Sequence, residues 1–505
     1  MSEPWTELRA AALVGTARRA PSPPEGGAVG ELLAGLPRDD RERLLLAAAG
    51  TLALRSRAGR ALPTEPDAAP EPAQTDDRPP CSAAAESYLA VMLGGRHAEA
   101  LPEWLEEAGR LGRRVRHRWL PELLELGRAR PELQPVLIPL LGPRGAWLAR
   151  RNREWAYACR TAEDDAEHWA TGERSQRRDA LHRLRARDPE PARTLLEEVW
   201  SSEGAAERAV FLGTLRERLG PADEPFLEAA LEDRSKEVRL AAADLLARLP
   251  GSALTRRMEA RALPLLSLRP GTLGPKLEAS PPAALTIDLE RDGVRAKAPS
   301  GSALGARAGW LRDIVAATPL EAWERHLRLP PDELIRLAAG SDWVTALLDG
   351  WAEAAARQRD RRWAETLLTA RRTPDGTTEE LLRVLEAPVR ERIAARYLRD
   401  ASDELAGRAA LAALDECPGP WGAELTRELL RLLRERVSRG RRGGSDYDLR
   451  RRMPGFGARM PVELLEEVEA GWPENAQDWP MWSGHVDELL ALLRFRRDML
   501  QEMHR

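Results

Sequence analysis

The sequence predicts an all-α protein that stacks helical hairpins into an α-solenoid, with one small β-hairpin inserted in the stack. Two observations carry this prediction. Residues 205–219 align with residues 235–249 at a constant offset of 30. Most of the remaining chain consists of short segments with the apolar spacing of amphipathic helices, separated by Gly or Pro. A repeated helical unit of this length indicates a repeat protein.

The two aligned segments match at apolar positions that would share one face of a helix. The matched pairs are Val210 with Leu240, Leu215 with Leu245 and Leu219 with Leu249. Each segment follows another amphipathic stretch, at 190–200 and 224–233, so the unit is a helical hairpin. Residues 231–249 resemble a HEAT repeat, and the expected fold class is therefore a HEAT-like α-solenoid. Because one hairpin cannot bury its apolar stripe alone, stacked hairpins share a continuous core and expose a long concave surface.

Changes in composition along the chain predict six segments. An N-terminal helical module (1–60) is followed by a Pro-rich linker (61–80). The body then comprises a helical region with a Trp-rich motif (81–174), HEAT-like repeats (175–268), a β-hairpin insertion with a Gly-rich loop (269–304) and a C-terminal helical repeat region (305–505). We expect the hairpin near 285–298, where apolar and polar residues alternate around the turn signal Asp292–Gly293.

Composition and charge argue against several classes of protein. With 77 basic and 81 acidic residues, the formal charge of −4 provides no global attraction to nucleic acid or anionic lipid. The three cysteines are far apart and match no zinc-ligand spacing. The N-terminus lacks the pattern of a signal peptide, and no window has the length and apolarity of a membrane span. We therefore expect a cytoplasmic bacterial protein without a membrane partner.

A search for catalytic chemistry finds no strong candidate. The sequence contains no P-loop, dinucleotide-binding glycine pattern, H-E-x-x-H or G-x-S-x-G motif. The Gly-rich stretch 300–309 lacks the Lys-Ser/Thr ending of a phosphate loop, and we interpret it as an ordinary connection. Asp164, Asp165 and His168 lie within one helical turn, but we interpret them as a solvated helix N-terminus rather than a metal site. We expect no catalytic residue, cofactor or metal.

An Arg-rich stretch at 431–460 leaves two interpretations open. It interleaves arginines with Tyr447 and Phe456 and could grip phosphate backbones or acidic protein tails. It could equally be a long solvated loop between helices. Its candidate partner-binding residues are Arg439, Arg441 and Arg442.

Two further stretches, residues 5–19 and 142–158, together with the linker and the repeats, resemble an uncharacterised bacterial family of unknown function. Genes of that family tend to neighbour MoxR-type AAA+ ATPases, von Willebrand factor A domain proteins and SWIM zinc-finger proteins. The resemblance implies a helical-repeat accessory factor for such an ATPase system and supplies no catalytic residues. Within the second stretch, the candidate partner-binding residues are Arg144, Trp147, Asn152 and Trp155. Asn152 could cap a helix or contact a ligand.

These observations together predict a non-enzymatic scaffold whose concave helical surface binds another protein. The partner implied by the resemblance is an AAA+ ATPase or a von Willebrand A domain protein. The alternative is a nucleic-acid-binding protein or a HEAT-like DNA glycosylase, which would need a basic concave groove with aromatic residues and a catalytic carboxylate.

Overall fold

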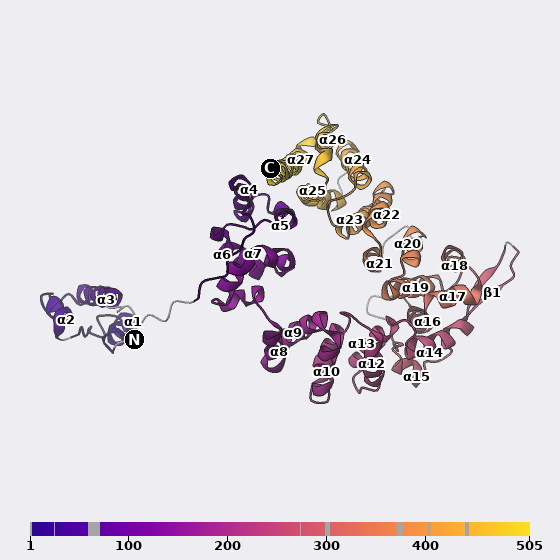
Figure 1. Cartoon of the computed structure of the whole chain (residues 1–505), viewed down its shortest axis with the longest axis horizontal. Helices are drawn as coiled ribbons and strands as arrows, with labels where there is room; N and C mark the ends of the chain where they lie inside the picture. Colours follow the sequence, from indigo (N-terminus) through magenta and orange to yellow (C-terminus); the bar gives the residue numbers. More distant parts are fainter. Residues whose placement is uncertain are drawn as a thin grey trace. The chain divides into compact units, whose positions relative to one another are not determined.

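The computed structural model describes residues 3–24, 26–58, 71–272, 274–297, 304–370, 377–401, 404–439 and 444–505 (Figure 1). The chain divides into two compact units, Met1–Ala73 and Gln74–Arg505. The described residues are mostly helical and contain one two-stranded antiparallel sheet. The prediction of an all-α chain is confirmed in this coarse form. Within the described residues, no helix combines the length and apolar composition that crossing a bilayer requires.

The first unit contains α1 (Glu3–Val14), α2 (Gly27–Ala34) and α3 (Arg41–Ala58). Helix α3 packs against both others, and the small core consists mainly of leucine, valine and alanine side chains. Four leucines of this unit, Leu13, Leu32, Leu46 and Leu54, are exposed. The unit therefore buries only part of its apolar side chains.

The second unit begins with a helical group that has its own core cluster. Its helices are α4 (Ala83–Leu93), α5 (Leu101–Arg110), α6 (Leu120–Ala129) and α7 (Gln134–Ala149), with the 3-10 helices η1 (Ala98–Ala100), η2 (His117–Trp119), η3 (Pro131–Leu133) and η4 (Arg153–Ala158). Helix α4 begins at Ser82, whose hydroxyl accepts a hydrogen bond from the Ala85 N–H at 3.0 Å. Pro102 and Pro121 stand in the first turns of α5 and α6, where their missing N–H groups cost nothing.

The segment with the sequence repeat consists of short helices that pack against one another. Its helices are α8 (Ala162–Thr171), α9 (Arg174–Arg187), α10 (Pro189–Val199), α11 (Ala205–Thr214), α12 (Glu224–Ala230), α13 (Lys236–Ala247) and α14 (Ala253–Ala262), with 3-10 helices η5 (Pro221–Asp223) and η6 (Leu263–Leu265). Helix α11 packs against both α9 and α13, while α10 packs on α9 and α12 on α13. Leu181, Phe211, Leu212 and Leu246 are fully buried and belong to one core cluster. Of the repeated apolar positions, Leu215, Leu245 and Leu249 are buried, whereas Val210, Leu219 and Leu240 are partly buried.

The β-hairpin lies earlier in the chain than predicted. Strands β1 (Leu266–Arg269) and β2 (Lys276–Ala279) pair antiparallel, with Leu266 opposite Ala279. The predicted hairpin at 285–298 is wrong, because α15 (Ile287–Arg291) occupies this segment. The Thr286 hydroxyl accepts a hydrogen bond from the Leu289 N–H at 3.3 Å and starts the helix. Gly293, with φ 94°, ends it.

The side chains of α15 explain why alternation was misleading. In a strand, residues 287 and 289 would lie on the same face. In the helix they diverge, so Ile287 is 85% exposed whereas Leu289 is 6% exposed. The Asp292–Gly293 pair marks the end of a helix here and not the turn of a hairpin.

The remaining helices form the C-terminal half of the second unit. They are α16 (Ala306–Ala316), α17 (Leu320–Leu327), α18 (Pro331–Ala338), α19 (Val344–Gln358), α20 (Arg361–Ala370), α21 (Thr378–Val384), α22 (Ala387–Arg399), α23 (Glu404–Asp415), α24 (Ala423–Arg439), α25 (Gly444–Phe456), η7 (Val462–Leu464), α26 (Leu465–Glu469) and α27 (Trp479–Met503). Five tryptophans of the described part of this half are buried between these helices: Trp323, Trp351, Trp363, Trp421 and Trp482.

The last helix of the second unit returns to its first helices (Figure 1). Helix α27 packs against α4 and α5, and its two faces belong to different core clusters. Leu489 and Leu493 join the larger cluster, whereas Leu492, Met499 and Met503 join the cluster of α4 to α7. The contact is reinforced by Arg496, which is 1% exposed. Helix α27 therefore links the beginning and the end of this unit.

Candidate functional site

The sequence motif at 142–158 lies around a kink in α7. Gly142 has φ 60°, a conformation that favours glycine. A Cβ atom there would lie 2.4 Å from Asp76 Oδ2. Asp76 accepts two hydrogen bonds from Arg78, at 2.9 and 2.7 Å, and Arg78 also donates to the Pro139 carbonyl at 2.8 Å. Residues 74–80, which the sequence predicted as linker, thus anchor on α7 at the glycine.

The four candidate partner-binding residues of this motif have interaction partners within the protein. Arg144 is exposed, and its Nη1 lies 2.6 Å from His117 Nδ1. Burial, together with the charge of Arg144, lowers the pKa of His117. The Asn152 side chain accepts a hydrogen bond from the Glu154 N–H at 3.1 Å and starts η4. Asn152 therefore serves as a helix cap here.

The two tryptophans of the motif are partly buried. Trp155 donates from Nε1 to Glu125 at 3.2 Å and packs against the core of α4 to α7. The guanidinium of Arg151 lies 3.7 Å from the ring centroid of Trp147. Both side chains are thus held in place by the protein itself.

The Arg-rich stretch is largely helical. Helix α24 continues to Arg439, and α25 covers 444–456, so the interpretation as a long loop is wrong. Leu449, Met453 and Phe456 recur at helical spacing and are buried, a signal that the surrounding arginines and glycines hid. Arg439 forms an ion pair with Glu435 one turn earlier. Arg441 and Arg442 lie outside the described residues.

The carboxylates and thiols that were considered for metal binding or catalysis are hydrogen-bonded, ion-paired or buried. Asp164 caps α8 and accepts a hydrogen bond from the Thr161 N–H at 2.7 Å. Asp165 is fully buried, not solvated as predicted, and pairs with Arg183 and Arg187 at 2.8 Å each. Burial raises the pKa of Cys81 to about 11 and that of Cys417 to about 12, so both thiols are protonated at neutral pH. Among the described residues, no three His, Cys, Asp or Glu side chains form a metal cluster.

Sequence reasoning missed a cavity of about 210 Å³ between α13, α15, α16 and α19. Its charged lining consists of Asp244, Asp292, Asp313, Glu353, Arg295 and Arg357. Arg357 donates to Asp244 at 3.0 Å and to Glu353 at 2.7 Å. These partners are separated by up to 113 residues in sequence, so no local pattern could have indicated the pairing.

Two carboxylates of this ion-pair cavity, Asp244 and Asp292, have lowered pKa values. Burial alone would raise the pKa of Asp292, but hydrogen bonds from Arg257 at 2.9 and 2.8 Å and from Arg261 at 2.6 Å lower it. Burial would also raise the pKa of Asp244. The nearby positive charge of Arg357 outweighs this effect, so the pKa of Asp244 is lowered. A carboxylate paired in this way cannot serve as a proton donor near neutral pH.

A larger groove of about 740 Å³ adjoins the ion-pair cavity and shares Arg357 with it. We call it the arginine groove. It lies where α9, α11, α13 and α19 end and where α21 passes. Its charged lining residues are His182, Arg216, Arg218, Arg248, Arg357, Arg359, Arg383, Glu217 and Glu380. Its other lining residues are aliphatic, glycine or proline, and no Phe, Tyr or Trp lines it.

Three of the six arginines in the groove have carboxylate partners. Arg248 pairs with Asp244 at 2.9 Å, and Arg383 pairs with Glu416 at 2.6 Å. Arg357 belongs to the ion-pair cavity described above. These three charges are therefore largely compensated.

The other three arginines are exposed and lack a carboxylate partner in the described part of the chain. Arg218 donates only to backbone carbonyls, those of Ala186 at 3.1 Å and Arg187 at 2.7 Å. Arg216 and Arg359 have neither a hydrogen-bond nor an ion-pair partner for their side chains among the described residues. The groove therefore keeps positive charge after its ion pairs are counted.

Two of these arginines also have unusual backbone conformations. Arg218 has φ 49° and Arg359 has φ 54°, both in the left-handed region. Such a conformation costs a non-glycine residue about 1 kcal/mol. Arg218 offsets this cost by capping the carbonyls at the end of α9. Arg359 ends α19 without such a compensating contact among the described residues.

Comparison with known proteins places the chain in a family. The sequence profile of the family of unknown function DUF5691 matches residues 7–503. The chain belongs to DUF5691. The resemblance to an uncharacterised family is confirmed at this level. No curated protein and no solved structure matches the chain.

The match to DUF5691 covers both the motif at 142–158 and the arginine groove. In this DUF5691 protein, the described clefts combine paired carboxylates with arginines, some of them unpaired. Arginine forks recognise carboxylates and phosphates by two parallel hydrogen bonds. The chemistry that these residues can perform is therefore recognition of an anionic group.

Proposed function

We propose that this protein is a non-enzymatic helical-repeat scaffold that binds another protein on the surface formed by successive helices. The observation that carries the proposal is the side-by-side packing of α9, α11 and α13, since the arginine groove is lined by His182 of α9 and by residues that follow α11 and α13. Repeat proteins present such rows as extended binding surfaces. Helices α9, α11 and α13 begin at Arg174, Ala205 and Lys236, a regular spacing close to the 30-residue sequence offset, and this supports a HEAT-like architecture.

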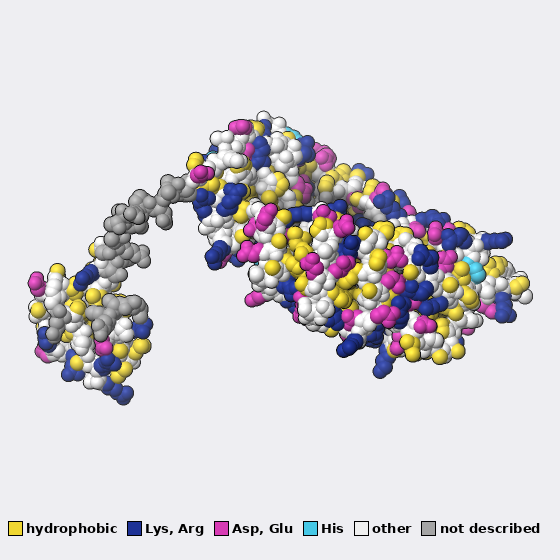
Figure 2. Space-filling view, turned by 60° about the horizontal axis from the view of Figure 1, so that its bottom comes forward, with side chains coloured by type: hydrophobic (Ala, Val, Ile, Leu, Met, Phe, Trp, Pro, Cys, Tyr) yellow, Lys and Arg dark blue, Asp and Glu magenta, His cyan; other side chains and the backbone are white. Residues whose placement is uncertain are grey.

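The state of the buried charges supports a binding role over catalysis. Asp244 and Asp292 have lowered pKa values because arginines surround them. An enzyme that transfers protons needs a group with a pKa near the working pH. Over the visible face of the second unit, basic and acidic side chains are interspersed (Figure 2). This pattern is typical of a surface without a single-sign field for nucleic acid.

The partner we propose is a protein of an AAA+ ATPase system, such as a MoxR-type ATPase or a von Willebrand A domain protein. This identity rests on the family resemblance of the sequence. In this role the scaffold would be cytoplasmic and would work without a cofactor.

The test uses the purified full chain with the MoxR-type ATPase and the von Willebrand A domain protein of its host. Mass photometry and isothermal titration calorimetry should show a saturable complex of defined stoichiometry, with a Kd of about 1 µM or tighter. A chain that stays monomeric with both proteins, and captures no protein from host lysate, would overturn the proposal. Retention on DNA with a steep salt dependence would favour the nucleic-acid alternative instead.

A further inference from the structure

We propose that the arginine groove binds an acidic peptide segment of the partner protein, one that alternates carboxylate and aliphatic side chains. This inference rests on the scaffold function proposed above and specifies the chemistry of the bound segment. Three features of the groove carry it: its unpaired arginines, its aliphatic lining residues and the absence of Phe, Tyr and Trp from its lining.

The unpaired arginines point to an anionic ligand. Arg216 and Arg218 follow the end of α11 and Arg359 follows the end of α19, and none has a carboxylate partner among the described residues. An arginine fork that meets a carboxylate forms hydrogen bonds about twice as strong as those between neutral groups. Three such forks in one groove can hold several carboxylates of one segment.

The strained backbone conformation of Arg359 supports a role for this residue in binding rather than in stabilising the fold. Its left-handed conformation at the end of α19 would favour glycine, yet the residue is an exposed arginine in the groove. Arg328 has the same φ of 54° and ends α17, but it does not line the groove. The two positions therefore form a matched pair for experiment.

The rest of the lining fits a peptide better than a nucleic acid. Leu219, Leu249 and Val384 supply aliphatic surface between the charges. Glu217 and Glu380 interrupt the row of arginines. A peptide can place aliphatic side chains beside such interruptions, whereas a phosphate backbone carries charge at every step. Proteins that bind single strands stack bases on large aromatic side chains, and no Phe, Tyr or Trp lines this groove.

The binding test uses the full chain and three fluorescent probes. The first probe is a short peptide that alternates Glu and Leu, the second replaces each Glu by Gln, and the third is a thymidine oligonucleotide. Fluorescence anisotropy should show saturable binding of the acidic peptide. The glutamine peptide should bind at least about tenfold more weakly, because it cannot form charge-assisted pairs.

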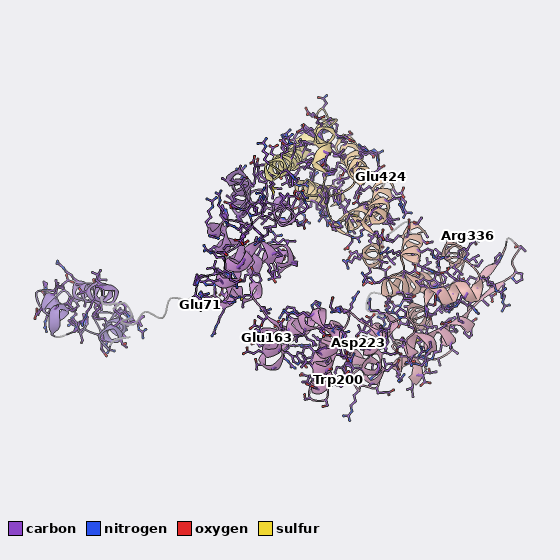
Figure 3. All side chains as sticks on the ribbon, in the orientation of Figure 1. Glu71, Glu163, Trp200, Asp223, Arg336 and Glu424 are labelled. Atoms are coloured by element: carbon purple, nitrogen blue, oxygen red, sulfur yellow. The ribbon has the colours of Figure 1, made fainter. Side chains whose placement is uncertain are left out.

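The variant Arg216→Glu with Arg359→Glu should weaken binding of the acidic peptide by about tenfold or more. Both side chains are exposed and unpaired, so the thermal unfolding of this variant should stay close to that of the wild type. The control variant, Arg325→Glu with Arg336→Glu, removes the same charge from α17 and α18, outside the groove (Arg336 is labelled in Figure 3). It should change the affinity by less than about twofold.

Glycine substitutions at Arg359 and Arg328, which share the same left-handed backbone conformation, distinguish an effect on binding from an effect on stability. Arg359→Gly should raise the Tm by about 1–2 °C and weaken peptide binding. Arg328→Gly should raise the Tm similarly and leave the affinity unchanged. Unchanged affinity in Arg359→Gly together with unchanged affinity in the double variant would overturn the inference.

Three other results would also overturn the inference: no binding of the acidic peptide to the wild type, equal weakening by the control variant, or groove-dependent binding of the oligonucleotide. The scaffold proposal is judged separately. If the protein partner binds the wild type and the Arg216→Glu, Arg359→Glu variant equally, the groove inference fails while the scaffold proposal stands. If no protein binds the wild type, the scaffold proposal itself fails.

Discussion

The contact between α27 and α5 depends on one buried ion pair. Arg496 donates from Nε and Nη2 to the two carboxylate oxygens of Glu103, each at 2.6 Å. Its Nη1 donates to the carbonyls of Gly457 and Met460, also at 2.6 Å. The guanidinium thus has four strong hydrogen bonds and almost no contact with water, since its side chain is 2% exposed.

Substituting Glu103→Ala leaves the Arg496 charge buried without its partner. Breaking a fully buried pair costs about 3–5 kcal/mol. The Glu103 side chain is 26% exposed, so water can partly replace the carboxylate, and we expect a cost of about 2–4 kcal/mol. Because α27 joins two core clusters, the loss should appear as local opening of α27 from α4 and α5.

Hydrogen exchange measured by mass spectrometry can resolve this opening. A loss of 2–4 kcal/mol corresponds to exchange about 30- to 900-fold faster in α27, α4 and α5, while α9 to α13 should keep their protection. Glu103→Leu combined with Arg496→Met should restore part of the protection, because an apolar pair needs no charge compensation. As a control, Glu467→Gln removes an exposed partner of Arg427 and should change exchange by less than about fivefold. Equal exchange in wild type and Glu103→Ala would refute this reasoning.

Three further changes test other parts of the structure. Gly142→Ala should lower the free energy of unfolding by about 2–3 kcal/mol in urea titrations, whereas Gly95→Ala, at φ 89° with open space around it, should cost about 1 kcal/mol. The lowered pKa of Asp292 means that its contribution to stability is present above about pH 3.8 and is lost as the pH falls through the folded-state pKa. Asp292→Asn should therefore be less stable than the wild type at pH 7, and urea titrations should show the gap closing below pH 3.8. Ile287→Lys should leave the Tm unchanged and Leu289→Lys should lower it, because only the second side chain is buried; similar shifts for both would contradict the helix at this segment.

Local signals in the sequence predicted much of the helical content. Ser235 and Ser252, like Ser82, accept hydrogen bonds from backbone N–H groups at helix starts, and Leu215, Leu245 and Leu249 of the repeat are buried. These features depend on neighbours within about four residues, so they can be read along the chain. The misplaced hairpin shows the limit: the alternation at 285–298 was real, but a cap at Thr286 and the burial of Leu289 decided for a helix.

The candidate site was predicted only in its local parts. The motif at 142–158 was recognised because its Gly, Arg and Trp residues stand close together, and Asn152 proved to cap its own segment. The arginine groove was not predicted. Its arginines looked like single charges in an Arg-rich sequence, and only their meeting at the ends of α11, α13, α19 and α21 gives them a common role.

The sequence by itself determined where helices form, how the repeat is spaced and which face of each helix is apolar. Only the tertiary structure decided that Arg496 meets Glu103, 393 residues away, and that Arg357 meets Asp244 across 113 residues. The physical reason is that capping and amphipathicity act within a few residues, whereas the pairing of buried charges depends on how distant helices pack. Which arginines stay unpaired, and so remain able to bind a ligand, is a result of that packing.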